Sequence, residues 1–336
     1  MDTARPGCRG RFIISVLGYE FISTEQLMIY ICIRLGATTD TIKEKHMRKP
    51  TTICFIGFGE AAEALCAGFS AIKRIAWDIK LDDPNESAPC KKRIEDSGVI
   101  AASSLSEAVC ESDWILSLVT ADQASIACHQ ASHYLKSGSS YFEMNSCSPG
   151  TKKANAEAVS NANAIPFDVA IMSPVNPSRL QTPLLLSGHN SDQASDIWSS
   201  FGYQAKAFSE DIGGASSVKM TRSIMIKGLE ALSAECLLTA KKLGIEQHIL
   251  DSLNKSFAGF DWHEKGGYNL ERMMQHGIRR AAEMREVVNT INEAGIPSNM
   301  TQSTVEWQQR IGDMHLTAES ESFDHLAIQV INRLDG

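Results

Sequence analysis

The sequence predicts an α/β fold in which a doubly wound parallel sheet is followed by an all-helical C-terminal half. Two observations lead to this prediction. Between residues 51 and 208, short apolar runs alternate with helical patterns, and parallel strands require crossover connections of this kind. From residue 214 to residue 334 the pattern is helical throughout. We therefore expect two domains, 47–210 and 211–336, preceded by an appendage over 1–46.

The expected strands are short runs rich in apolar residues, and the first is a continuous apolar run, which is typical of a strand buried on both faces of a parallel sheet. They lie at residues 51–56, 74–79, 99–102, 114–119, 141–144, 167–172, 184–186 and 204–208. Helices are expected at 60–69, from Ser104 onward with Glu107 completing a capping box, between the fourth and fifth strands, and at 150–162 and 192–200. In the second half they are expected at 214–243, 246–257, 269–293, 299–312 and 318–334, with breaks at 266–267 and 295–297.

Composition and charge argue against several classes of function. The 336 residues are enough for two domains, and 43% hydrophobic with 21% charged residues is average for a globular protein. A net charge of −8 argues against general binding to nucleic acid or anionic membranes. No apolar run is long enough to span a bilayer, and no Cys/His spacing is typical of a metal site. The nine scattered cysteines suit a reducing cytoplasm.

Residues 1–46 are interpreted as an appendage with no inferred function. Arginines near the start precede a short apolar run, as in a signal peptide, but Glu20 and Glu25 interrupt the pattern and no cleavage motif follows. Met47 lies just before the first well-patterned strand, so we consider it as a natural start of translation.

A glycine-rich turn follows the first expected strand. Residues 57–62, Gly-Phe-Gly-Glu-Ala-Ala, fit the pattern G-x-G-x-x-G/A. Gly57 allows a tight turn, Gly59 has no Cβ to obstruct a pyrophosphate, and the next helix presents unpaired N–H groups. The turn therefore predicts a dinucleotide-binding site, with a glycine turn of some other α/β fold as the alternative.

The residue at the end of the second strand bears on the identity of the dinucleotide. Asp78 follows Gly57 by 21 residues, where a carboxylate accepts hydrogen bonds from ribose hydroxyls. Such a carboxylate repels a 2′-phosphate, so NAD is the expected cofactor. Arg74 and Lys80 lie close by in the sequence and leave NADP as the alternative.

With the segment Ile56–Ala62 in place, the chain resembles the β-hydroxyacid dehydrogenase superfamily, which includes 3-hydroxyisobutyrate and 6-phosphogluconate dehydrogenases. The resemblance covers about residues 50–312. Residues 213–223 and 276–284 are similar to a less characterised, 6-phosphogluconate-dehydrogenase-like branch with its own type of C-terminal domain. The resemblance implies a homodimeric enzyme that transfers hydride between nicotinamide and a small β-hydroxy acid or sugar acid.

The resemblance also implies roles for particular segments. Residues 117–120 resemble a loop that lies along the nicotinamide half of the cofactor, and residues 145–149 resemble a loop that contacts the substrate carboxylate. Residues 168–174 resemble a second substrate-facing segment, with Ser173-Pro174 in place of the usual small residues. The predicted cofactor-binding residues are Gly57, Phe58, Gly59, Glu60, Ala61, Asp78, Val119 and Thr120.

Lys219 matches the lysine of the superfamily's Gly-x-x-x-Lys-x-x-x-Asn helix and is the predicted general acid/base. A lysine shielded from water can lose its proton near neutral pH and accept one from a substrate hydroxyl. Ser223 replaces the usual asparagine, while Arg222 and Lys227 either favour an anionic substrate or face solvent. The predicted substrate-binding residues are Asn145, Ser146, Ser173, Ser223 and Arg280.

Several alternatives stay open at this point. Arg280 contacts the substrate or forms an ion pair with Glu283 on a solvated face. Trp262-His263 is a lid or ordinary packing. An imine or keto-acid reductase of the same superfamily is the alternative activity, although Lys219 argues against the imine reductase. A non-catalytic NAD-binding sensor is the alternative from another class.

Overall fold

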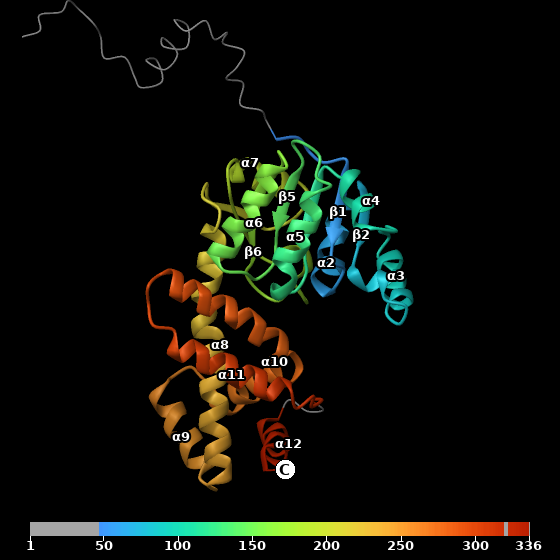
Figure 1. Ribbon diagram of the computed structural model, residues 1–336. Helices are drawn as coiled ribbons and strands as arrows, with labels where there is room; N and C mark the ends of the chain where they lie inside the picture. Colours follow the sequence, from blue (N-terminus) through green and yellow to red (C-terminus); the bar gives the residue numbers. More distant parts are fainter. Residues whose placement is uncertain (1–46, 319–321, 336) are drawn as a thin grey trace, which may run out of the picture. The chain divides into compact units, whose positions relative to one another are not determined.

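The computed structural model describes residues 47–318 and 322–335, so the expectations for residues 1–46 lie outside the described part. Within that part, eight strands form one sheet in the order β3-β2-β1-β4-β5-β6-β7-β8 (Figure 1). The strands are β1 (Thr52–Ile56), β2 (Lys73–Trp77), β3 (Ile100–Ala101), β4 (Trp114–Ser117), β5 (Ser140–Glu143), β6 (Ile165–Ile171), β7 (Leu184–Ser187) and β8 (Ala205–Ser209). The predicted α/β architecture is confirmed.

The strand order reverses between β1 and β4. From β1 the chain proceeds outward through β2 and β3, and it then returns to β4 on the other side of β1. Only the pairing of β6 with β7 is antiparallel among the strand pairs of the described chain. The carboxyl ends of β1, β4 and β5 therefore meet at one edge, beside the point of reversal where doubly wound sheets bind ligands.

Helices cover both faces of the sheet because the side chains of each central strand alternate between two cores. In β1, Ile53 and Phe55 belong to one core, and Cys54 and Ile56 belong to the other. The first core includes residues of α2 (Glu60–Leu65), α3 (Ser87–Asp96) and α7 (Ser191–Ser200). The second includes residues of α4 (Leu105–Cys110), α5 (Ala124–Ser132) and α6 (Pro149–Asn161). Short 3₁₀ helices are η2 (Cys66–Phe69), η3 (Ile79–Asp82), η4 (Ala121–Gln123) and η5 (Arg179–Gln181).

The chain after residue 213 is helical, as predicted (Figure 1). Its helices are α8 (Gly214–Lys242), α9 (Glu246–Ser256), α10 (Trp262–Glu293), α11 (Asn299–Gly312) and α12 (Phe323–Asp335). All five contribute to one apolar core that contains, among others, Leu237, Met273 and Phe323. None of the helices in the described ranges is both long and apolar enough to cross a membrane.

The break expected at Gly266-Gly267 is absent, because both glycines lie inside α10. A Cβ at Gly266 would overlap the buried side chain of Leu237 in α8, so the missing side chain lets the two helices approach closely. Asp261 caps α10 by accepting the N–H groups of His263 at 3.0 Å and Glu264 at 3.2 Å. Trp262-His263 is therefore the first turn of a long helix.

Three other elements differ from the expectation. Helix α3 was not expected, because its sequence is mostly polar and only Cys90 and Ile94 are buried along it. Helix α12 begins at Phe323, five residues later than the predicted start. Strand β2 ends at Trp77, so Asp78 follows the strand and begins η3.

Candidate functional site

The glycine turn lies at the carboxyl end of β1, against the loop that follows β4. Gly57 has a φ of +82°, and a Cβ there would lie 2.7 Å from the Leu118 carbonyl oxygen and 2.8 Å from Val119 Cγ1. A Cβ at Gly59 would meet no atom within 4 Å. The first glycine is thus required by close packing, while the second leaves open space at the start of α2. That open space fits the approach of a pyrophosphate.

The Asp78 carboxylate links the glycine turn to the end of β2 by hydrogen bonds. Its Oδ2 accepts the Phe58 N–H at 2.7 Å and its Oδ1 accepts the Lys80 N–H at 3.0 Å. The Phe58 ring is buried and packs edge-on against Phe55, with ring centroids 6.0 Å apart. The ring of Phe58, a predicted cofactor residue, therefore belongs to the core, and its N–H is bound to Asp78.

The other predicted cofactor residues lie around the same turn. Ala61 and Val119 are half-buried, and Glu60 and Thr120 are exposed. Glu60 Oε1 accepts a hydrogen bond from the Asn176 amide at 3.0 Å. The turn and the loop after β4 are in contact through Gly57, so these residues line one edge of the sheet.

The two cations near Asp78 are already paired. The Arg74 guanidinium donates to the carbonyl oxygens of Cys66 at 3.0 Å and Gly98 at 2.9 Å. The Lys80 ammonium lies 2.5 Å from Glu86 Oε2. Both side chains therefore have partners within the chain itself.

Lys219 lies in the second turn of α8, at the same edge of the sheet. Its Nζ donates a hydrogen bond to Ser146 Oγ at 2.8 Å, and both side chains are half-buried. Burial lowers the pKa of Lys219 to about 8, against the opposing effect of the Glu283 carboxylate. Ser146 belongs to the loop after β5, and that loop joins the edge because the Met144 N–H donates to the Ser117 carbonyl at 3.1 Å.

The start of α8 is fixed to the sheet by hydrogen bonds. Asp168 on β6 accepts the Ser216 N–H at 2.9 Å and the Ser216 hydroxyl at 2.5 Å. The Ser187 hydroxyl on β7 accepts the Ala215 N–H at 2.9 Å. Lys219 follows Ser216 by three residues, so these bonds set the position from which its side chain reaches Ser146.

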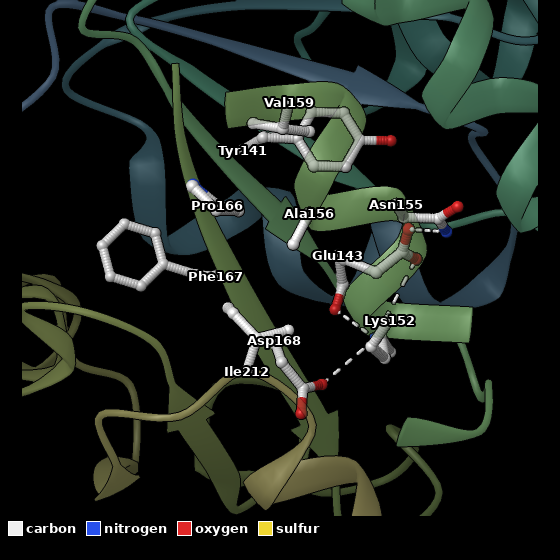
Figure 2. Close-up of a pocket in the computed structure, with 10 residues that line it drawn as sticks. All are labelled: Tyr141, Glu143, Lys152, Asn155, Ala156, Val159, Pro166, Phe167, Asp168 and Ile212. Atoms are coloured by element: carbon white, nitrogen blue, oxygen red, sulfur yellow. Dashed lines mark hydrogen bonds and ion pairs between the residues drawn. The ribbon is translucent and has the colours of Figure 1, made fainter. Parts of the chain in front are cut away.

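A buried polar cluster around Lys152 lies next to the start of α8, and sequence reasoning missed it (Figure 2). The Lys152 ammonium donates to the Glu143 carbonyl at 2.5 Å and lies 3.3 Å from Asp168 Oδ1. Burial raises the pKa of the Glu143 carboxyl. The cluster borders a cavity of about 10 Å³, about the space that one water needs. The sequence signal that could have indicated this cluster was Glu143, a charged residue within the otherwise apolar run 141–144.

The predicted substrate residues other than Ser146 have different surroundings. The Asn145 amide is buried and donates to Ser117 Oγ at 2.9 Å and to the Glu143 carboxylate. Ser173 is half-buried, and its hydroxyl lies 3.4 Å from the Pro174 carbonyl. Ser223 is buried one turn after Lys219 on the same face of α8. Asn145 thus connects strand ends, and Ser223 stays next to the lysine.

Arg280, a predicted substrate residue, is bound to another side chain of the helical half. Its guanidinium forms a bidentate ion pair with Glu230 of α8, in which Nε lies 3.0 Å from Oε2. Both side chains are buried. Gln308 of α11 donates to the same carboxylate at 2.9 Å. The expected alternative, an ion pair with Glu283, is also absent for this arginine. Helices α8, α10 and α11 are instead joined through one buried carboxylate.

Lys227 and Glu283 form a second pair between α8 and α10, with a distance of 2.6 Å. Lys227 is buried, whereas Arg222 is exposed. The ammonium groups of Lys227 and Lys219 and the guanidinium of Arg279 hold the pKa of Glu283 at about 2, against the opposing effect of burial. Lys219, Ser223 and Lys227 follow one another at four-residue spacing, so the pair continues the face of α8 that carries Lys219.

Two carboxylates of α10 bind the start of α6, next to the loop that carries Ser146. The Ser148 N–H donates to Glu286 Oε2 at 2.7 Å, and the Ser148 hydroxyl donates to Glu293 Oε1 at 2.7 Å. The Gly150 N–H donates to Glu293 Oε2 at 3.0 Å. Sequence reasoning did not single out either glutamate, because their partners are more than 130 residues away.

The fold and the edge just described define the class of dinucleotide-binding α/β proteins with a helical C-terminal region. Comparison with known proteins narrows this class. A family model described as a domain of unknown function, DUF1932, matches residues 240–311. A conserved hypothetical protein from Sinorhizobium meliloti 1021 is 31% identical with a TM-score of 0.66, over 86% of this chain and 98% of that protein.

Two further proteins are similar to this chain. An uncharacterized 28.5 kDa protein of Methanothermus fervidus is 28% identical over 204 residues, which are 61% of this chain and 76% of that protein. The 3-hydroxyisobutyrate dehydrogenase of Mycobacterium tuberculosis shares the fold at 12% identity, with a TM-score of 0.65 over 84% of this chain and 98% of that protein. The chain therefore belongs to one family with the Sinorhizobium meliloti protein, and it shares the fold of the 3-hydroxyisobutyrate dehydrogenase.

Proposed function

We propose that the protein is an NAD-dependent oxidoreductase that interconverts the alcohol and carbonyl forms of a small hydroxy compound, with Lys219 as general acid/base. One observation carries the proposal. The Lys219 ammonium lies 2.8 Å from the Ser146 hydroxyl at the edge where β1, β4 and β5 end, beside the glycine turn. A proton acceptor at this place is what hydride transfer from a carbinol requires.

The chemistry follows from the protonation of Lys219. When bound, the nicotinamide ring supplies the hydride acceptor in oxidation and the donor in reduction. A neutral Lys219 takes the hydroxyl proton of the substrate as the carbonyl forms, and its ammonium returns that proton in the reverse direction. Because its pKa is about 8, both forms are accessible near neutral pH. The Ser146 hydroxyl accepts from Nζ and so orients it.

The surroundings of the turn support NAD over NADP. Asp78 stands where the adenosine ribose is bound in related sheets, and its charge opposes a 2′-phosphate. Arg74 already donates to two backbone carbonyls and Lys80 is paired with Glu86, so neither positive charge is dedicated to such a phosphate. Gly57, Gly59, Glu60, Ala61, Val119 and Thr120 complete the proposed cofactor site.

The resemblance to the superfamily points to a β-hydroxy acid or a sugar acid as the substrate. Ser146 and Ser223 stand beside Lys219 and can hydrogen-bond a substrate hydroxyl or carbonyl. The exposed Arg222 can attract an anionic substrate, whereas Lys227 is paired with Glu283. A homodimer and the domain limits 47–210 and 211–336 are also parts of the proposal.

Replacement of Lys219 tests the activity. We expect Lys219→Ala to lower kcat/KM by about 10²- to 10⁴-fold on any substrate that the wild-type protein turns over with NAD. Binding of NAD, measured by calorimetric titration in parallel with NADP, should be unchanged and tighter than that of NADP. Lys255→Ala, which changes an exposed lysine of α9, is the matched control.

Two outcomes would contradict the proposal. If Lys219→Ala kept wild-type turnover, the proton would have to be taken up by another group. If NAD bound but no hydroxy acid, sugar acid or neutral alcohol were oxidised at any pH, the non-catalytic sensor would be the better description.

A further inference from the structure

The first turn of α6 has no hydrogen-bond donor left for a ligand among its backbone groups. A helix start ordinarily exposes several N–H groups that bind anions. Here the Ser148 N–H is bound to Glu286 and the Gly150 N–H to Glu293. Residue 149 is proline and has no N–H, and the Thr151 N–H donates to the Ser148 hydroxyl at 3.1 Å. The positive end of this helix is therefore satisfied by the chain itself.

Both helices contribute residues that shape the contact between α6 and α10. Glu286 and Glu293 are seven residues apart, so both project from one face of α10. Glu286 also accepts the Thr151 hydroxyl at 3.0 Å. A Cβ at Gly150 would overlap the Glu293 carboxylate, so the glycine leaves the space that this carboxylate fills. Hydrogen bonds from N–H groups to carboxylates are among the stronger ones in proteins.

This contact adjoins the proposed reaction site. Ser148 lies two residues after Ser146, which receives the Lys219 hydrogen bond. Between them, Cys147 is buried. The loop that carries Ser146 therefore leads directly into the contact between Ser148 and Glu286.

We propose that Glu286 and Glu293 determine specificity by occupying the anion-binding start of α6, so that the substrate presents an uncharged or amino-bearing end to residues 145–151. This inference rests on the proposed oxidoreductase function, and it replaces the hydroxy acid that the resemblance points to with a hydroxy compound whose other end carries no negative charge. A substrate carboxylate at this place would have to displace up to four hydrogen bonds and face two like charges. An ester, an amide or an amine meets no such repulsion.

The test compares three alcohols that differ only at the other end: 3-hydroxypropanoate, its methyl ester, and 3-aminopropan-1-ol. With NAD and the full chain, we expect kcat/KM for the ester or the amino alcohol to exceed that for the acid by at least about tenfold. In Glu286→Gln/Glu293→Gln, which keeps the shape of each side chain and one acceptor oxygen in place of two, the acid should gain and this ratio should approach one. Glu157→Gln/Glu306→Gln, two exposed glutamates, removes the same charge as the matched control.

A binding measurement separates this inference from the proposed activity. Calorimetric titration of the NAD-saturated protein with acetate should show at least about tenfold tighter binding to the double variant than to the wild-type and control proteins. Wild-type preference for the acid in turnover, or acetate binding that the double variant does not improve, would overturn the inference. Absence of turnover on all three alcohols would count against the proposed function, while the acetate result still decides the role of the glutamates. If the double variant proves unstable in a thermal melt, Glu286→Gln alone is compared in the same way.

Discussion

The proton affinity of Lys219 depends on burial and on charged groups that act in opposite directions. Burial and the nearby ammonium groups of Lys227 and Lys152 favour the neutral amine, and the Glu283 carboxylate favours the ammonium. The base in oxidation must be neutral, so kcat/KM for oxidation should rise with pH through about 8. Reduction needs the ammonium, and its kcat/KM should fall over the same range.

Changing the pair beside Lys219 should move this transition in opposite directions. Glu283→Gln removes the negative charge, so the pKa of Lys219 falls and the rise in oxidation moves to lower pH. Lys227→Met removes a positive charge, so the pKa rises and the transition moves to higher pH. Measurement of kcat/KM from pH 6 to 10 in both directions checks the signs.

A merely structural role for the pair would give a different result. Breaking a buried ion pair is expected to cost about 3–5 kcal/mol of stability, so both variants should melt earlier than wild type. If both lost activity by the same factor at every pH, with no displacement of the profile, the pair would stabilise the fold without tuning Lys219.

Single residues were predictable from sequence where a local pattern fixed their chemistry. The glycine turn, Asp78 and Lys219 stand in short motifs, and the structure brings all three to one edge of the sheet. Arg280 was not predictable in this way, because Glu230, the residue that binds it, lies 50 residues earlier in the chain. Patterns along one helix show which side chains share a face and leave open what that face contacts.

At the scale of elements, glycines decide how closely the C-terminal helices pack. Gly277 of α10 and Gly312 of α11 meet at a crossing, where a Cβ at Gly277 would overlap the Gln308 carbonyl oxygen and lie 2.8 Å from Gly312 Cα. These neighbours are backbone atoms, which cannot rotate away as a side chain can. The crossing therefore depends on the absence of a side chain at residue 277.

This packing gives a stability prediction with a matched control. Gly277→Ala should lower the free energy of unfolding by about 1–3 kcal/mol, since the helices must separate to admit the methyl group. Gly228→Ala should raise it by about 0.5–1 kcal/mol, because a Cβ there has its nearest neighbour, Thr304 Oγ1, at 4.0 Å and alanine favours the helix. Denaturant unfolding of both variants checks the two signs. If the two substitutions changed the free energy of unfolding by the same amount, α10 and α11 would shift freely at their crossing.

Another pair of glycines, inside α10, shows why sequence patterns predicted some elements well and others poorly. Apolar periodicity identified the strands and most helices, because burial on a sheet or in a bundle imposes it. Gly266-Gly267 was taken as a break because isolated glycines weaken helices, yet the close approach of Leu237 makes glycine the residue that fits inside α10. Tertiary packing overrode local propensity there, and a mostly polar helix such as α3 gave too little periodicity to detect.

For the molecule as a whole, the proposed site is assembled from four separate stretches of sequence. The loop after β5, the start of α8 and the end of α10 meet through hydrogen bonds that join residues 73 and 145 positions apart. The glycine turn lies against the loop after β4 at the same edge of the sheet. Sequence motifs could identify the first three stretches. The fourth lies outside any motif, since Glu286 and Glu293 acquire their role only through the docking of α10 on α6.

The helical half also leaves an apolar stripe exposed, and this stripe supports the proposed homodimer. Met225 and Leu232 on α8 are 63% and 56% exposed and lie on one face at seven-residue spacing, and Met300 on α11 is 74% exposed. Helices α8 and α11 are packed together, so these side chains belong to neighbouring surfaces. A stripe of this kind suits a twofold contact in which the same surface of two chains pairs with itself.

Charge placed on the stripe should therefore dissociate the dimer. We expect light scattering at micromolar concentration to give twice the mass of one chain for wild type and the mass of one chain for Met225→Glu/Leu232→Glu. Ile79→Glu/Ile126→Glu changes two comparably exposed apolar residues next to the sheet, at 65% and 51% exposure, and should remain dimeric. A wild-type protein of single-chain mass would contradict the homodimer. A double α8 variant that stayed dimeric would place the contact on another surface, because two buried charges per chain could not be accommodated at a self-paired stripe without partners.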